Sequence, residues 1–239
     1  MNRTFRRTLT SVVFACAAAL STSPASAKKA APVAAEPASP LPAAAAPPVG
    51  TTVPAKGTAL AAVRAANATI AKQLAQKPAP GSAEEAKLAK AVTETVRNFI
   101  DFDILATRAI HETEWAAATE GQRKEYLVVL RALLEANYVR GMRSNLAFTV
   151  DYIGEFAAPA GNAVIVQTVI KAKRKGRPIS IKVDYTVETK IAGGVGVVDI
   201  ATDGVGLIAN YREQFTKIIK KDGFDGLLTK MKKKQATTK

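Results

Sequence analysis

The spacing of apolar and polar residues divides the chain near residue 144. Before this point apolar residues recur every three or four positions, which predicts amphipathic helices. After Arg143 they alternate with polar residues, which predicts half-buried strands. Between Asp199 and Phe215 the period changes back from two to 3.6, with Gly204 at the changeover. We therefore expect a set of helices, then a sheet, then a helix that follows the last strand directly.

The first half contains two separate helical stripes followed by a short and a long helix. One stripe begins after Thr58 and comprises Leu60, Val63, Ile70 and Leu74. The second is capped by Ser82 and comprises Leu88, Val92, Val96 and Phe99. A short helix through Ile104, Leu105 and Ile110 restarts at Asp101 or Asp103. Thr119 and Gln122 form a capping-box pattern, which predicts a helix over about 120–141.

This last helix is apolar around most of its circumference. Its large apolar residues are Tyr126, Leu127, Val129, Leu130, Leu133, Leu134 and Tyr138. Such an arc is wider than the stripe of a surface helix, so other elements must cover it on more than one side.

Four strands follow, each with one apolar face. The faces comprise Leu146, Phe148, Val150 and Tyr152; Val164, Val166, Thr168 and Ile170; Ile181, Val183, Tyr185 and Val187; and Val198 and Ile200. Short turns, including Gly161–Asn162 and Gly193–Gly194, join them. The pattern predicts an antiparallel four-stranded meander, and therefore an α+β fold with helices covering one face of a curved sheet.

The N-terminal quarter of the chain differs in composition. Residues 1–27 have a basic start, an apolar run and a small-residue Ala25–Ser26–Ala27 site, which predicts a cleaved secretory signal. The alternatives are an uncleaved anchor and a lipoprotein modified at Cys16. Residues 28–57 are rich in alanine and proline, which predicts a disordered linker or a tether. Residues 58–239 form a single domain, and the periplasm is the expected compartment.

Charge limits the partners of the chain. Its formal net charge is +14, and loss of the three arginines in residues 1–27 lowers this to +11. Export and the absence of interleaved aromatic and basic residues argue against nucleic acid. The excess of lysine fits an anionic membrane surface or an acidic protein, and a merely solvated C-terminal end is the alternative.

Candidate catalytic residues are few. His111 is the only histidine, and Cys16 lies in the predicted signal, so a zinc site of several His or Cys ligands is not available. Neither a phosphate-binding glycine loop nor a nucleophile elbow is present. Four acids, Asp151, Asp184, Glu188 and Asp199, alternate out of phase with the apolar faces and are expected to face solvent.

The apolar content suggests another function. Four one-faced strands and a helix apolar on most sides provide more hydrophobic surface than a two-layer core needs. A cavity lined by these residues would suit an acyl chain. An ordinary filled core is the alternative, because protein interiors normally pack without voids.

Two segments resemble a known family. Residues 199–215, followed by 218–227, resemble the C-terminal signature of the MlaC family, also called toluene-tolerance proteins. Trp115, Ala118–Thr119 and Gln122–Arg123 resemble its central segment. Gly206 departs from a serine usual in the family, and Val195 falls near a position that often carries tryptophan.

The resemblance implies an NTF2-like or cystatin-like fold with a deep apolar pocket for acyl chains. It further implies a monomeric, non-enzymatic periplasmic carrier, with phospholipid as cargo and no cofactor. Such a carrier shuttles lipid between an outer-membrane lipoprotein complex and the inner-membrane lipid-binding ring of an ABC transporter, which maintains outer-membrane lipid asymmetry.

For this carrier, periodicity places ten residues in the pocket. They are Leu105, Tyr126, Leu130, Leu133, Val150, Tyr152, Val166, Val183, Tyr185 and Val198. Two other functions stay open at this point. An NTF2-like isomerase or hydrolase would need an inward carboxylate, such as that of Asp151 or Asp184. A scaffold would bind a partner through the linker and the basic tail, with an ordinary packed domain.

Overall fold

The computed structural model describes residues 54–143, 148–159, 161–174, 177–190 and 194–237. The helices are α1 (Thr58–Leu74), α2 (Ala83–Phe99), α3 (Phe102–Arg108), α4 (Glu112–Ala117), α5 (Glu120–Arg143) and α6 (Leu207–Ala236). The strands are β1 (Phe148–Ala157), β2 (Val164–Arg174), β3 (Arg177–Thr189), β4 (Val195–Thr202) and β5 (Val205–Gly206). The predicted Leu146, the side chain of Tyr138 and residues 1–53 lie outside the described part.

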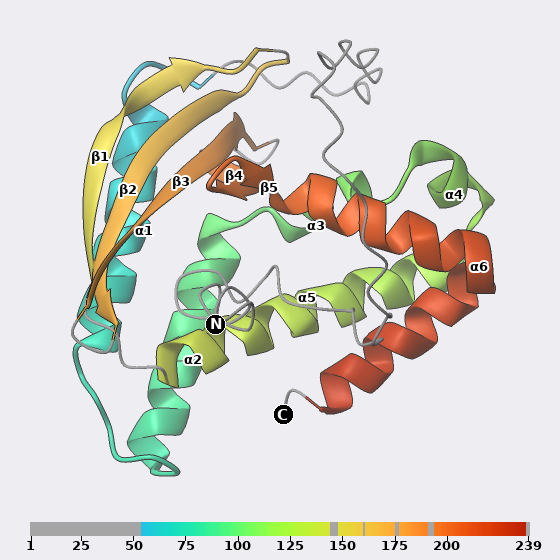
Figure 1. The fold of residues 1–239 in the computed structure, drawn as a ribbon, viewed down its shortest axis with the longest axis horizontal. Helices are drawn as coiled ribbons and strands as arrows, with labels where there is room; N and C mark the ends of the chain where they lie inside the picture. Colours follow the sequence, from blue (N-terminus) through green and yellow to red (C-terminus); the bar gives the residue numbers. More distant parts are fainter. Residues whose placement is uncertain (1–53, 144–147, 160, 175–176, 191–193, 238–239) are drawn as a thin grey trace, which may run out of the picture.

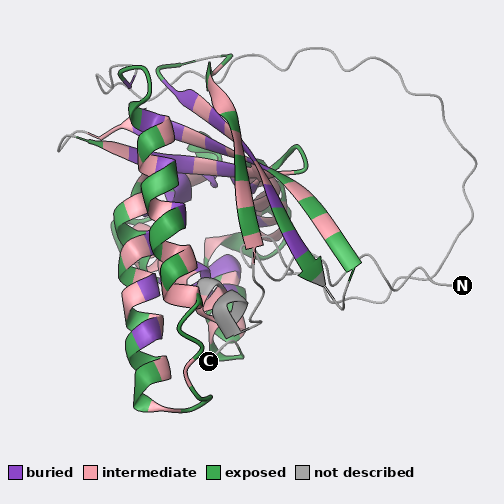
Figure 2. Cartoon of the chain, turned by 90° about the vertical axis from the view of Figure 1, so that its left-hand side faces the viewer, coloured by how far each residue is buried: buried purple, intermediate pink, exposed green. Residues whose placement is uncertain are grey.

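The strands form one curved sheet in the order β1-β2-β3-β4-β5, and every neighbouring pair is antiparallel. The predicted α+β fold and meander are confirmed, with a short fifth strand added. Helix α1 lies along one face of the sheet, while α5 and α6 pack on each other beside it (Figure 1). Buried positions run along the strands, and the outer sides of the helices are exposed (Figure 2).

A bulge in β1 changes which residues face α1. The register shifts between Tyr152 and Gly154, so Glu155 lies opposite Val166 instead of on the outer face. Its two carboxylate oxygens accept hydrogen bonds from the backbone N–H groups of Gly57, at 3.0 Å, and Leu60, at 2.8 Å. Because α1 has no side-chain cap of its own, this long-range carboxylate satisfies its N-terminus.

The predicted caps of α2 and α5 are present. The Ser82 hydroxyl accepts from the Glu85 N–H. Thr119 and Gln122 each bond the other's backbone N–H, at 3.2 and 2.9 Å. Helix α5 is covered by α2, α3 and α6, as its wide apolar arc requires. Val128, which was not assigned to that arc, is 69% exposed.

Helix α6 has 30 residues and is interrupted by a kink at Gly223, where φ is +71°. Val205, directly after the Gly204 changeover, lies in β5 and is exposed. The two-residue pairing of β4 with β5 uses Val205 to turn the chain, so the helix begins only at Leu207. The short helix α4 was not predicted.

Candidate functional site

The inner face of the sheet is a continuous apolar surface made of cross-strand rows. One row joins Val150, Ile170 and Ile181, and the next joins Tyr152, Thr168 and Val183. A third brings Val166 and Tyr185 together with Ile200 of β4. Side chains directly opposite in neighbouring strands contact each other, so the rows form one surface. Helix α1 packs on this face and contacts β1, β2, β3 and β4.

The structure brings most of the ten predicted pocket residues into one interior. Seven are buried in the central hydrophobic cluster: Leu105, Tyr126, Leu130, Leu133, Val166, Val183 and Tyr185. Val150 and Tyr152 are half-buried and pack against that cluster. Val198 is buried but lies outside it, because a bulge in β4 pairs Val197 with Val187 and puts Val197 in the cluster instead.

Tyr126 occupies the helical end of this interior. Its ring packs against Trp115, Phe215 and Phe224 at centroid distances of 6.0, 5.9 and 5.9 Å. Its hydroxyl donates to the Ala106 carbonyl at 3.0 Å, and burial raises its pKa well above the usual value. The tyrosine therefore stays neutral and links α5 to α3, α4 and α6.

Half-buried apolar side chains extend the interior to the protein surface. From α1 they are Leu60, Ile70 and Leu74, from α2 Phe99, from β1 Phe148, and from β3 Ile181. Phe99 contacts Tyr185 at a centroid distance of 5.8 Å. An apolar surface that passes from solvent into the interior is the kind that acyl chains occupy.

Three polar groups lie between α1 and the sheet. Asn67 is 9% exposed, and its side-chain amide interacts with the Tyr185 hydroxyl. Burial raises the pKa of the nearby Tyr185 hydroxyl, and the Asn67 amide opposes part of that increase. The exposed Arg64 guanidinium lies 4.6 Å from the centroid of the Tyr152 ring. The sequence analysis missed Asn67, although its position four residues after Val63 and three before Ile70 places it on the inner stripe.

Two of the four acids expected to face solvent do not. Glu188 is 8% exposed, and its carboxylate accepts two hydrogen bonds from Arg108, at 2.6 and 3.1 Å. Asp199 accepts from the backbone N–H groups of Ile200, at 2.8 Å, and Ile208, at 3.1 Å. It thereby caps the start of α6, while burial raises its pKa. Alternation predicted solvent, but at this edge α3 and α6 pack over β4.

The other two acids lie on the outer face of the sheet, as predicted. Asp151 pairs with Val169 in the register, is exposed, and forms an ion pair with Lys171 at 2.5 Å. Asp184 pairs with Gln167 on the same face, and partial burial raises its pKa. His111 is exposed at the N-cap of α4. Among the described residues, no group of three His, Cys, Asp or Glu side chains could hold a metal ion.

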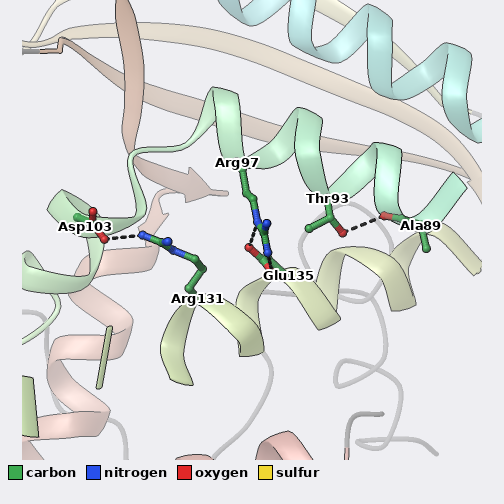
Figure 3. A network of polar contacts seen from close by, with 6 residues as sticks. All are labelled: Ala89, Thr93, Arg97, Asp103, Arg131 and Glu135. Carbon is green, nitrogen blue, oxygen red and sulfur yellow. Dashed lines mark hydrogen bonds and ion pairs between the residues drawn. The ribbon is translucent and has the colours of Figure 1, made fainter. Parts of the chain in front are cut away.

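Ion pairs join α5 to α2 and to α3 (Figure 3). Arg97 binds Glu135 through two hydrogen bonds, at 2.6 and 2.9 Å, and Arg131 binds Asp103 at 2.6 Å. These four residues, with Leu127 and Val128, line an open surface groove of about 590 Å³. None of the ten predicted pocket residues lines this groove, so it is not the predicted pocket.

Comparison with known proteins identifies the family. The MlaC protein model matches residues 64–233. The chain belongs to the MlaC family. Among solved structures, this MlaC-family chain is similar to a phospholipid-binding protein from Ralstonia solanacearum, in complex with a phospholipid. The two share 25% sequence identity with a TM-score of 0.64, covering 76% of this chain and 99% of that chain. A search of curated proteins found no match.

The family assignment confirms the resemblance drawn from residues 199–227, all of which fall within the matched range. In the described part of the MlaC-family chain, no helix is long and apolar enough to cross a membrane.

Proposed function

We propose that this chain binds a phospholipid and carries it between membranes, with the acyl chains in the interior between the sheet and helices α1, α3 and α5. The observation that carries the proposal is the similarity, over nearly the whole length of that chain, to a structure that holds a phospholipid. The apolar rows of the sheet support it, because each buried methylene of an acyl chain contributes about 0.8 kcal/mol.

The proposed pocket consists of the predicted residues on the inner face, with Val150 and Tyr152 at its half-buried edge. The phosphate and headgroup would stay near solvent, because an unpaired charge is costly to bury. We further propose that the chain works in the periplasm after removal of residues 1–27. Its partners would be an outer-membrane lipoprotein complex and the inner-membrane ring of an ABC transporter.

The enzyme alternative loses its two candidate acids. It required Asp151 or Asp184 to point inward, and both lie on the outer face of the sheet. The family assignment and the phospholipid-binding structure also favour a carrier that performs no covalent chemistry.

Lipid binding is tested by native mass spectrometry of the purified full chain, and by uptake from phosphatidylglycerol vesicles after delipidation. We expect a co-purifying phospholipid and renewed uptake. Val150→Asp, at the edge of the proposed pocket, should reduce uptake about tenfold or more, because a carboxylate there is desolvated by bound chains. The control Val128→Asp, on the exposed side of α5, should leave uptake unchanged. Protein that neither retains nor takes up lipid would instead support the scaffold alternative.

A further inference from the structure

One end of the sheet carries an excess of positive charge. From Phe156 to Val183 the sequence contains no aspartate or glutamate, and its basic residues gather where β2 and β3 form a hairpin. Four of them are exposed and form what we call the basic hairpin surface: Lys171, Lys173, Arg177 and Lys182. Like charges held this close together favour an anionic partner.

Only part of this charge is neutralised within the protein. Lys171 forms an ion pair with Asp151 at 2.5 Å, and Lys182 lies near the Asp184 carboxylate. The other two basic residues form no ion pair with any residue that the structure describes. The basic hairpin surface therefore keeps a net positive charge that faces solvent.

The opposite face of the same strand ends is apolar. Phe148, Ala172 and Ile179 form one row across β1, β2 and β3 on the inner face of the sheet. The next row contains Ile181 and also Val150, which lies at the edge of the proposed pocket. The basic hairpin surface and this edge are therefore at the same end of the sheet, whereas the lysine-rich helix α6 carries none of the ten predicted pocket residues.

The chemistry of the basic hairpin surface fits an anionic bilayer better than an acidic protein. Specific protein interfaces are centred on large aromatic or apolar side chains. The exposed large hydrophobic residues of the described chain all lie outside residues 171–182, at Val128, Ile153, Phe156 and Val205. Three of the four basic residues are lysines, which attract phosphate as point charges and require no fixed geometry.

We propose that the basic hairpin surface docks on the anionic phospholipid headgroups of a bilayer. The attraction is electrostatic, and it brings the end of the sheet that carries Val150 to the membrane. The inference goes beyond the proposed function, because it names a surface that contacts the membrane itself. It is tested by vesicle binding, whereas the proposed function is tested by lipid uptake, so the two can fail separately.

The test is co-sedimentation of the full chain, exported by a bacterial host, with vesicles of phosphatidylglycerol or of phosphatidylcholine. We expect wild type to bind the anionic vesicles only, and to be released by salt. Each basic residue near an anionic surface strengthens binding about fivefold, so Lys173→Gln/Arg177→Gln should bind roughly thirtyfold more weakly. The control Lys220→Gln/Lys221→Gln removes the same charge from exposed positions of α6 and should bind as wild type does.

Two outcomes would overturn the docking surface. Wild type that binds both kinds of vesicle equally, or neither, would exclude an anionic bilayer as the partner and leave an acidic protein. Equal losses in the two double variants would show that net charge, and not the hairpin, determines binding. If the hairpin double variant does not fold, Lys173→Gln alone should still lose about fivefold. Hairpin-dependent binding without lipid uptake would support the docking surface and overturn only the proposed function.

Discussion

The ion pair of Arg108 and Glu188 is the polar contact whose loss should destabilise the protein most clearly. Glu188 lies on β3 and Arg108 at the end of α3, 80 residues apart in the sequence. The Arg108 carbonyl also accepts both the Nε–H and a terminal N–H of Arg212 from α6. Glu188→Gln keeps the shape of the side chain and removes its charge, so it tests the electrostatic contribution of this junction.

The expected cost follows from the exposure of the two partners. The Glu188 side chain is 10% exposed and that of Arg108 is 32% exposed. Breaking a fully buried pair costs about 3–5 kcal/mol, whereas exposed pairs contribute about 1 kcal/mol or less. A pair with one partner a third exposed lies between these limits, so we expect a loss of about 2 kcal/mol. For a domain of this size that loss lowers the melting temperature by about 4–8 °C.

Urea unfolding followed by circular dichroism measures this change directly. The matched control is Glu213→Gln, which breaks the exposed pair with Lys217 on α6 and should leave the midpoint unchanged. The double variant Arg108→Met/Glu188→Leu should be less destabilised than Glu188→Gln, because it leaves no uncompensated charge. Equal midpoints for Glu188→Gln and Glu213→Gln would refute the reasoning.

Two further predictions concern the junction of β4 and α6. Burial raises the pKa of the Asp199 carboxyl above its ordinary value of 3.8. The protonated carboxyl therefore contributes fully to stability below pH 3.8, and this contribution is lost as the pH rises through the folded-state pKa. Asp199→Asn should lack this decline in unfolding free energies measured from pH 3 to 7, and equal slopes would contradict the assignment. Tyr211 stacks on Phe215 at 5.1 Å, so Tyr211→Ala should cost about 2 kcal/mol and reduce lipid retention in parallel. Retention lost at an unchanged melting temperature would indicate a direct contact with lipid or a partner.

The main elements could be predicted because local chemistry determines them. Ser82 and the Thr119–Gln122 box cap the helices that they were expected to cap. Alternation in the strands identified the inner faces of β2 and β3, where Val166, Val183 and Tyr185 are buried. The pairing between these two strands has no irregularity, so the period of two holds over the residues that carry Val166, Val183 and Tyr185.

The misplacement of Val198 has its physical origin in a β-bulge. In β4 a bulge moved Val197 into the main cluster in place of Val198, and in β1 a bulge turned Glu155 toward α1. A bulge inserts one residue and reverses the faces beyond it, and the alternation pattern alone does not locate it. The burial of Glu188 was missed for another reason, since its partner Arg108 is distant in the sequence.

The segment that identifies the family and the residues proposed to bind lipid have different tasks. Within 199–215, Asp199 caps α6, Arg212 bonds the end of α3, and Phe215 packs on Tyr126. These contacts hold α6 and α3 against the sheet, and α3 carries Leu105 of the proposed pocket. The proposed pocket itself is made of apolar faces that any acyl chain could contact, so it offers little discrimination.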